Sequence, residues 1–191
     1  MAPGRSFTLS GLARHLNAPQ YRLIHLCEKG VIAPDVEDAH GRGSSRLFSA
    51  HNLLEFAIAL RLRAAMLPVA AVGAVLRVLR AFEGRLQREL PGFSLPESLR
   101  EDRAPDLRII VSDGSTIYFS LGRPGGETNV FGGVPLDQIT GDKPASMKAA
   151  TIAAMPAGKG AGANGFGGPE GSRFVRLELS VTEIARDLPL D

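Results

Sequence analysis

Apolar side chains near the start of the chain recur every three or four residues, the spacing of one buried helix face. A helix is predicted over residues 10–16, with Ser10 as its N-cap and apolar positions at Leu9, Leu12, Ala13 and Leu16. The segment 17–19 predicts a turn, and a second helix is predicted over 20–29, ended by Gly30. Two short helices joined by a tight turn predict a helix-turn-helix unit.

The following segment predicts a small hairpin, or wing, and then a third helix. Extended apolar segments at 31–34 and 46–48 flank a polar stretch that contains glycines. Ser49 is a suitable N-cap for a helix that continues to about residue 65. The inward positions of this helix have helical spacing and are Leu53, Leu54, Ala57, Ile58 and Leu62.

A fourth helix is predicted from Pro68 onward, and its apolar positions favour a coiled coil. They alternate in steps of three and four, at Val72, Val75, Leu79, Phe82 and Leu86, with arginines between them. We therefore predict that residues 71–92 pair with a second copy of the chain in a homodimer. Because the pattern covers only about two heptads, an amphipathic helix folded onto its own domain is the alternative.

The second half of the chain changes from helical spacing to alternation of apolar and polar residues. After a polar, proline-containing linker at 93–105, two alternating segments flank Asp113-Gly114, a strong hairpin turn. Further strands are predicted at 128–131, 134–139 and 173–181, followed by a short helix at 182–188. The Gly- and Ala-rich stretch 156–171 predicts a mobile loop. The predicted fold class is α+β, with a winged helix-turn-helix at 1–70, the coiled-coil dimerisation helix at 71–92 and a small, mainly antiparallel β domain at 106–191.

Charge is distributed unevenly between the two halves. Residues 1–90 hold 12 Lys and Arg against 7 acids, a net charge of +5, and all 4 histidines. Residues 91–191 hold 10 bases and 13 acids, a net charge of −3. A basic first half is typical of a module that binds a polyanion, although chance scatter of surface charge could give similar counts.

Targeting and membrane signals are not found in the sequence. The first residues contain no apolar run of signal-peptide length, and no stretch approaches the roughly 20 apolar residues that span a bilayer. Cys27 is the only cysteine, which excludes an internal disulfide and a cysteine-rich metal site. We therefore expect a cytoplasmic protein, associated with the nucleoid, and no membrane partner.

The second predicted helix has an outer face suited to double-stranded DNA. At about 100° per residue, its apolar side chains fall on one side and its polar side chains on the other. The candidates for phosphate and base contact on this helix are Gln20, Tyr21, Arg22, His25 and Lys29. In the wing, His40, Arg42 and Arg46 are candidates for phosphate contact beside glycines. A merely solvated helix face and a polar turn are the alternatives.

The order of these segments resembles the MerR family of transcriptional regulators over about residues 7–90. The matching motifs are residues 7–13, the segment 30–34, Arg46-Leu47-Phe48-Ser49 and the inter-helix segment 66–72. The resemblance implies a winged helix-turn-helix and a homodimer joined by an antiparallel coiled coil. It also implies binding to a pseudo-palindromic promoter element, which is distorted so that RNA polymerase can use an overlong spacer.

Two positions depart from the pattern of that family. Where the family usually has an Arg-Tyr pair in the recognition helix, this chain has Ile24-His25, so a guanidinium contact cannot be made from position 24 and Arg22 would replace it. Where the family has a tyrosine beside the wing, this chain has Phe48, which lacks the hydroxyl. The mercury, copper and iron-sulfur sensors of the family use cysteines after the DNA-binding domain, and this chain has none there.

Enzymatic activity is not expected, and no cofactor or metal is predicted. The second half of the chain contains no His or Cys, the commonest general base and nucleophile. Residues 160–165 match a dinucleotide-binding pattern literally, but no strand leads into them and no helix can open after them.

The leading hypothesis is a dimeric MerR-like DNA-binding transcriptional regulator with an effector or oligomerisation domain. One alternative is a MerR-like architectural or accessory DNA-binding protein that oligomerises through its β domain. The other is a protein-interaction module that has lost DNA binding.

Overall fold

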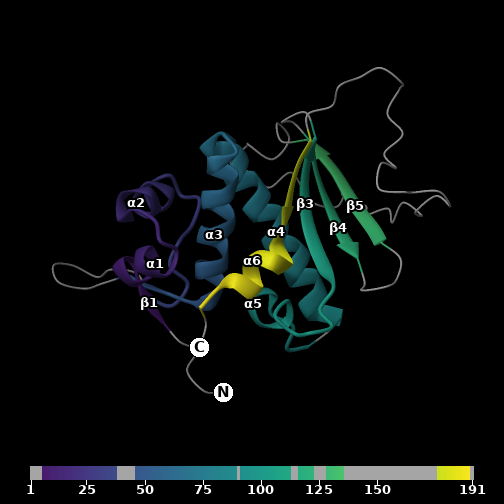
Figure 1. The fold of residues 1–191 in the computed structure, drawn as a ribbon, viewed down its shortest axis with the longest axis horizontal. Coiled ribbons are helices and arrows are strands. Elements are labelled where there is room, and N and C mark those ends of the chain that lie inside the picture. The colour runs from purple at the N-terminus through teal and green to yellow at the C-terminus, as the bar shows by residue number, and fades with distance from the viewer. Residues whose placement is uncertain are drawn as a thin grey trace. The chain divides into compact units, whose positions relative to one another are not determined.

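The computed structural model describes residues 6–37, 46–89, 91–112, 116–122, 128–135 and 176–189 (Figure 1). The chain divides into two compact units, one formed by Met1–Arg100 with Glu183–Asp191 and the other by Glu101–Thr182. The first unit is mainly helical and the second contains an antiparallel sheet. This mixture of helix and sheet confirms the predicted α+β class.

Two short helices, α1 (Leu9–His15) and α2 (Gln20–Glu28), open the helical unit. The prediction of Ser10 as the N-cap of α1 is wrong by two residues. Thr8 is the cap, because its backbone is extended and its Oγ1 accepts a hydrogen bond from the Gly11 backbone N–H at 3.2 Å. The end of α2 is as predicted, since Gly30 follows the helix with a φ of +64°.

The small sheet of this unit has different strands from those predicted. Strand β1 (Phe7–Thr8) pairs antiparallel with β2 (Leu47–Phe48), whereas residues 31–34 form no strand. The backbone N–H groups of Val31 and Ile32 donate to the Leu26 carbonyl at the end of α2, and both side chains are buried. Val31 and Ile32 therefore provide hydrogen-bond donors to the C-terminal end of α2 and pack in the core, and they do not form a strand of a hairpin.

Helices α3 (Ala50–Ala64) and α4 (Val69–Glu89) provide most of the remaining helical unit. Ser49 caps α3 as predicted, and its Oγ accepts hydrogen bonds from the N–H groups of His51 and Asn52. The predicted inward positions of α3 are all buried. The α3–α4 turn contains Met66 at a φ of +66°, a conformation that ends one helix before Pro68 leads into the next.

The predicted linker at 93–105 is partly structured. It contains the short helix α5 (Leu95–Ser98), and Leu95 and Leu99 are buried. These two leucines are four residues apart, which places them on the same side of a helical turn. Only the segment after Arg100 belongs to the second unit.

The C-terminal helix α6 (Val181–Asp187) is at the predicted place, but most of it belongs to the first unit. The Arg61 guanidinium lies 3.4 Å from the Asp187 carboxylate, and Arg100 donates to the Leu188 carbonyl at 3.0 Å. The β domain predicted over 106–191 therefore ends before Glu183.

The second unit contains an antiparallel sheet with the strand order β5-β4-β3-β6. Its strands are β3 (Asp106–Ser112), β4 (Thr116–Gly122), β5 (Thr128–Pro135) and β6 (Arg176–Ser180). The two predicted alternating strands around residues 113–114 are confirmed as β3 and β4. They pair antiparallel, and Ser112 lies opposite Thr116. This register leaves three residues, not two, between the strands.

In the region of β5 the sequence predicts two strands, at 128–131 and 134–139, with two glycines between them. The structure has one strand, in which Gly132 pairs with Tyr118 and Val134 pairs with Ile117. Gly133 is thus an extra residue in the ladder. The glycines mark a β-bulge and not a strand end.

Several predictions fall outside the described residues. They concern the wing tip at 38–45 with His40 and Arg42, the turn Asp113-Gly114, residues 136–139 and 173–175, and the glycine-rich stretch 156–171. Within the part of the chain that the structure describes, no helix is long and apolar enough to cross a membrane.

Candidate nucleic-acid interface

Helix α2 presents its polar side to solvent, as the helical spacing predicts. The Tyr21 side chain is 65% exposed and that of Ile24 is 37% exposed, while Leu23 and Leu26 are buried. All five residues predicted on this helix for DNA contact are exposed: Gln20, Tyr21, Arg22, His25 and Lys29. We call these five residues and Ile24 the α2 face. It combines the permanent cation Arg22, a histidine, an amide and a phenol on a nine-residue helix with a second cation, Lys29, at its C-cap.

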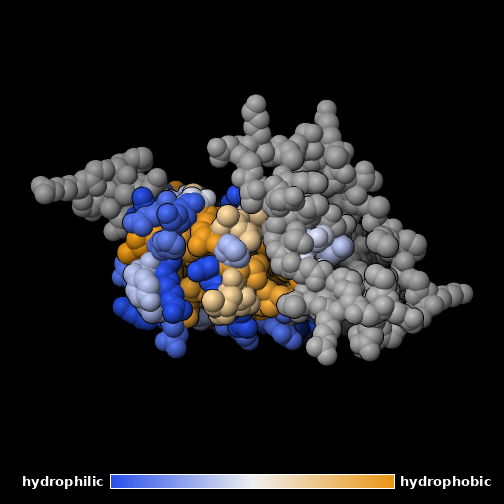
Figure 2. All heavy atoms as spheres, turned by 90° about the horizontal axis from the view of Figure 1, so that it is seen from above, coloured by the Kyte–Doolittle hydropathy of each residue, from blue (hydrophilic) through white to orange (hydrophobic). Residues whose placement is uncertain are grey.

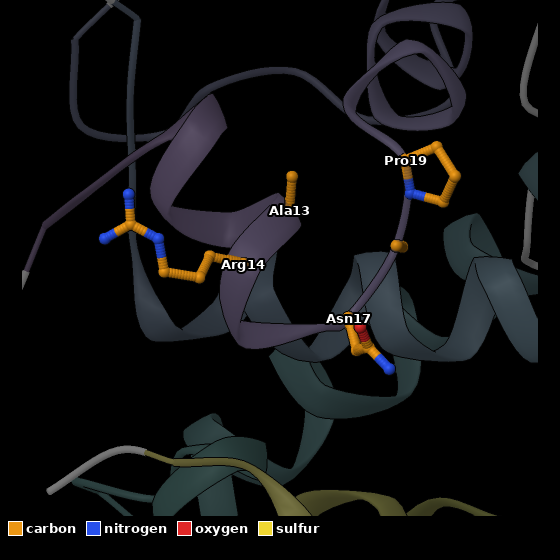
Figure 3. A pocket seen from close by; sticks show the side chains of 5 residues that line it. Ala13, Arg14, Asn17 and Pro19 are labelled. Atoms are coloured by element: carbon orange, nitrogen blue, oxygen red, sulfur yellow. The ribbon is translucent and has the colours of Figure 1, made fainter.

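The turn before α2 fixes where this face begins. Asn17 adopts a φ of +47°, and Pro19, with a φ of −59°, occupies the N-cap position of α2. A shallow pocket lies at this turn, lined by Ala13, Arg14, Asn17, Ala18 and Pro19 (Figure 3). In the close-up, Arg14 extends from α1 on the side away from Pro19. Arg14 is exposed and adds a cation to α1 that the sequence analysis did not single out.

The base of the wing is closed by backbone hydrogen bonds. Glu37 and Leu47 form an antiparallel bridge, in which the Leu47 N–H donates to the Glu37 carbonyl at 2.9 Å and the Glu37 N–H donates to the Leu47 carbonyl at 3.3 Å. The intervening residues 38–45 start and end at this bridge. Arg46 is exposed next to it, and His40 and Arg42 lie outside the described residues.

Polar contacts attach the chain before the wing to the start of α3. The Asp35 carboxylate accepts hydrogen bonds from the Ser49 N–H at 2.9 Å and from the Ser49 hydroxyl. Asn52, a buried side chain of α3, accepts from the Asp35 N–H at 3.1 Å and donates to the Ala33 carbonyl at 3.1 Å. These bonds hold the segment between α2 and the wing against α3.

A buried carboxylate joins this cluster to α4. The Glu55 side chain is 8% exposed and forms an ion pair with the Arg80 guanidinium of α4, with one N–O distance of 2.9 Å. Asn52 also donates to Glu55, at 3.2 Å. The same Arg80 donates to the Val31 carbonyl at 3.2 Å, so a single guanidinium contacts both α3 and the segment that follows α2. We call Asp35, Ser49, Asn52, Glu55 and Arg80 the wing-base network.

A second buried carboxylate, Glu83 of α4, joins α3 to α5. Its Oε1 lies 2.5 Å from His51 Nε2 and accepts a hydrogen bond from the Leu95 N–H at 2.8 Å. Burial lowers the pKa of His51, but the hydrogen bond to Glu83 and the negative charges of Glu83, Glu55 and Asp35 outweigh it. The pKa of His51 is therefore raised above its ordinary value of 6.5.

Sequence reasoning missed these buried polar groups, although one signal was present. Glu55 is the only charged residue in the stretch 53–60, where its neighbours are apolar. An isolated acid on a helix that is otherwise apolar all round is expected to have a buried partner, because an unpaired buried charge is costly. Nothing in the sequence shows that the partner is Arg80, 25 residues away.

The predicted coiled-coil seam requires a correction. Val72, Val75, Leu79 and Phe82 are buried within the single chain, and Leu86 is half-buried. Four of the five seam positions are therefore covered without a second copy, as in the alternative of an amphipathic helix folded onto its own domain. Of these positions, Leu86 keeps the most surface for an interface. The homodimer itself stays a prediction.

Among the described residues, no group of three or more His, Cys, Asp or Glu side chains could hold a metal ion. Titratable groups meet in the buried pairs described above, and also on the sheet, where the Arg108 guanidinium contacts the carboxylates of Asp106 and Glu178. On α2 and beside the Glu37–Leu47 bridge, polar side chains are exposed to solvent.

A comparison of the chain with protein-family models finds no match, and neither does a comparison with curated proteins.

Proposed function

We propose that this protein is a DNA-binding transcriptional regulator of the MerR type, with α1 and α2 as a helix-turn-helix and residues 38–45 as its wing. The observation that supports the proposal most is the exposed α2 face, in which Arg22 and Lys29 accompany Gln20, Tyr21 and His25. The second helix of such a unit enters the major groove, where these side chains can contact phosphates and base edges.

The base of the wing supports the same proposal. Arg46 is exposed at the bridge between Glu37 and Leu47, next to backbone groups that are held by hydrogen bonds. A cation on a fixed backbone can contact a phosphate with little loss of conformational entropy on binding. In the proposed complex, α2 contacts the bases and Arg46 contacts the backbone of the same duplex.

Salt-dependent binding to double-stranded DNA tests this function. The full chain is expected to bind mixed duplexes with an affinity that falls steeply with salt, because each phosphate contact releases counterions. Arg22→Ala and Arg46→Ala are each expected to weaken binding and to reduce the salt slope by about one unit. Fluorescence anisotropy at several salt concentrations measures both quantities.

Arg88→Ala is the matched control for these two variants. Arg88 is an exposed arginine on α4, eight residues after Arg80 and therefore about 12 Å further along the helix. This variant removes the same charge away from the α2 face and is expected to leave the salt slope unchanged. A wild-type protein without salt-dependent DNA binding would contradict the proposal and favour the protein-interaction module.

We also propose that the protein is a homodimer in which the C-terminal part of α4 contributes Leu86. Sedimentation of the Leu86→Asp variant tests this, because an aspartate in an apolar interface must lose its hydration. The expected result is a dimer in the wild type and a larger monomer fraction in the variant. Gln87→Asp, at the next and exposed position, is the control and should remain dimeric. A wild-type monomer at micromolar concentration would contradict the dimer.

A further inference from the structure

One side chain on the α2 face has no role in phosphate binding. Ile24 is 37% exposed and cannot donate or accept a hydrogen bond. Four large hydrophobic side chains are exposed in the described part of the chain, and two of them, Tyr21 and Ile24, are on α2. They are three residues apart, so they are neighbours on the helix surface. Figure 2 shows that, on the face drawn, exposed apolar surface lies beside strongly hydrophilic surface.

The charge around this apolar pair favours a polyanion as the occupant. Arg22 and His25 are exposed on the same helix and Lys29 is exposed at its C-cap, while Glu28 is the only acid within Gln20–Glu28. An apolar protein partner would have to remove water from these charged groups without replacing it. A DNA groove offers phosphates to the cations and base edges to the side chains between them.

We propose that Ile24, together with Tyr21, recognises the 5-methyl group of a pyrimidine in the major groove, which in ordinary DNA is thymine. This inference rests on the proposed DNA-binding function. The base edges in the major groove present hydrogen-bond donors and acceptors, and the thymine methyl is the apolar group among them. An isoleucine placed over the other groups would remove their water and provide no hydrogen bond in return. Ile24 therefore favours thymine at the base pair that it faces.

Replacement of thymine by uracil isolates this methyl group, because uracil keeps the O4 acceptor. Burial of one CH2-sized group is worth about 0.8 kcal/mol, which corresponds to about fourfold in affinity. Duplexes that bind the full chain are first enriched from a random pool. Each thymine of the enriched site is then replaced by deoxyuridine, and the affinity is measured by fluorescence anisotropy.

We expect at least one thymine in each half-site whose replacement weakens wild-type binding about fourfold. The Ile24→Val variant, which keeps a branched apolar side chain, is expected to retain this difference between thymine and uracil. The Ile24→Ala variant is expected to bind both duplexes with nearly equal affinity. At the same position, 5-methylcytosine is expected to bind more tightly than cytosine, which separates the methyl group from the other features of thymine.

The outcomes distinguish this inference from the proposed function. Salt-dependent DNA binding without any effect of uracil would overturn the role of Ile24 and leave DNA binding intact. An effect of uracil that persists in Ile24→Ala would also overturn it, because another residue would then contact the methyl. A protein that enriches no duplex would overturn the proposed function and this inference together. The uracil measurement on the wild type needs no variant, so a wild type that binds both duplexes equally overturns the role of Ile24 even if Ile24→Ala is unstable.

Discussion

Replacement of Arg80 by methionine is expected to lower the free energy of unfolding by about 2 kcal/mol. The substitution leaves the carboxylate of Glu55, which is 8% exposed, without its cationic partner. Breaking a buried ion pair by removing one partner typically costs about 3–5 kcal/mol. Since the Arg80 side chain is 42% exposed, water can reach part of the vacated site, and the expected cost is therefore below that range. Urea denaturation followed by circular dichroism measures the change.

A double-mutant cycle separates the ion pair from the other contacts of Arg80. The variant Glu55→Met with Arg80→Met is expected to be more stable than Arg80→Met alone, because no unpaired charge remains buried. It should not regain all of the wild-type stability, since Arg80 also donates to the Val31 carbonyl and Asn52 donates to Glu55. Arg88→Met, at an exposed position of the same helix, is the control, with an expected change within about 0.5 kcal/mol. Equal stability of Arg80→Met and the control would contradict the importance of the pair.

Helices α1 to α4 of the first unit could be predicted from the sequence because each depends on local signals. The helical spacing of apolar residues predicted α1, α2, α3 and α4. The hydroxyl of Ser49 makes it a good N-cap for α3, and Gly30 readily adopts the positive φ that ends α2. The error at Ser10 has a local cause, since Thr8 and Ser10 are both good caps. Only the extended backbone of Thr8 in β1 decides between them.

The features that sequence reasoning missed depend on partners far apart in the chain. Strand β2 pairs with Phe7–Thr8, about 40 residues earlier, and not with the nearby apolar segment 31–34. Loop closure between such distant segments leaves no periodic signal in the sequence. The assignment of α6 to the first unit is of the same kind, since it depends on contacts such as Arg61 with Asp187.

The apolar seam of α4 shows how one pattern can have two causes. Alternating steps of three and four are typical of a coiled coil, but a helix buried in its own fold needs the same apolar positions. The structure buries four of the five seam positions within one chain: Val72, Val75, Leu79 and Phe82. For the α2 face, in contrast, the helical spacing in the sequence was enough to predict which side chains are exposed. A face that the described part of the chain leaves exposed needs no distant partner to be predicted.

The stability of the helical unit is expected to depend on pH through His51. The pKa of this histidine is raised in the folded state by Glu83, Glu55 and Asp35, although burial lowers it. A folded-state pKa above the unfolded value means that the folded protein binds the proton more tightly. The stabilisation is therefore fully present below about pH 6.5 and is lost as the pH rises through the raised pKa. Each unit by which the pKa is raised contributes about 1.4 kcal/mol at low pH.

Glu83→Gln is the variant that tests this dependence. Glutamine keeps an oxygen that can accept the hydrogen bond from the Leu95 N–H, but it removes the negative charge that lies 2.5 Å from His51. Chemical denaturation between pH 5.5 and 8.5, a range of about 1 unit below and 2 units above the ordinary histidine value, should show a stability advantage of the wild type that shrinks as pH rises. NMR titration of the His51 ring should show a lower pKa in the variant than in the wild type. If the two proteins lose stability in parallel over this range, the Glu83 charge does not hold the proton on His51. The pair would then contribute through packing and neutral hydrogen bonds alone.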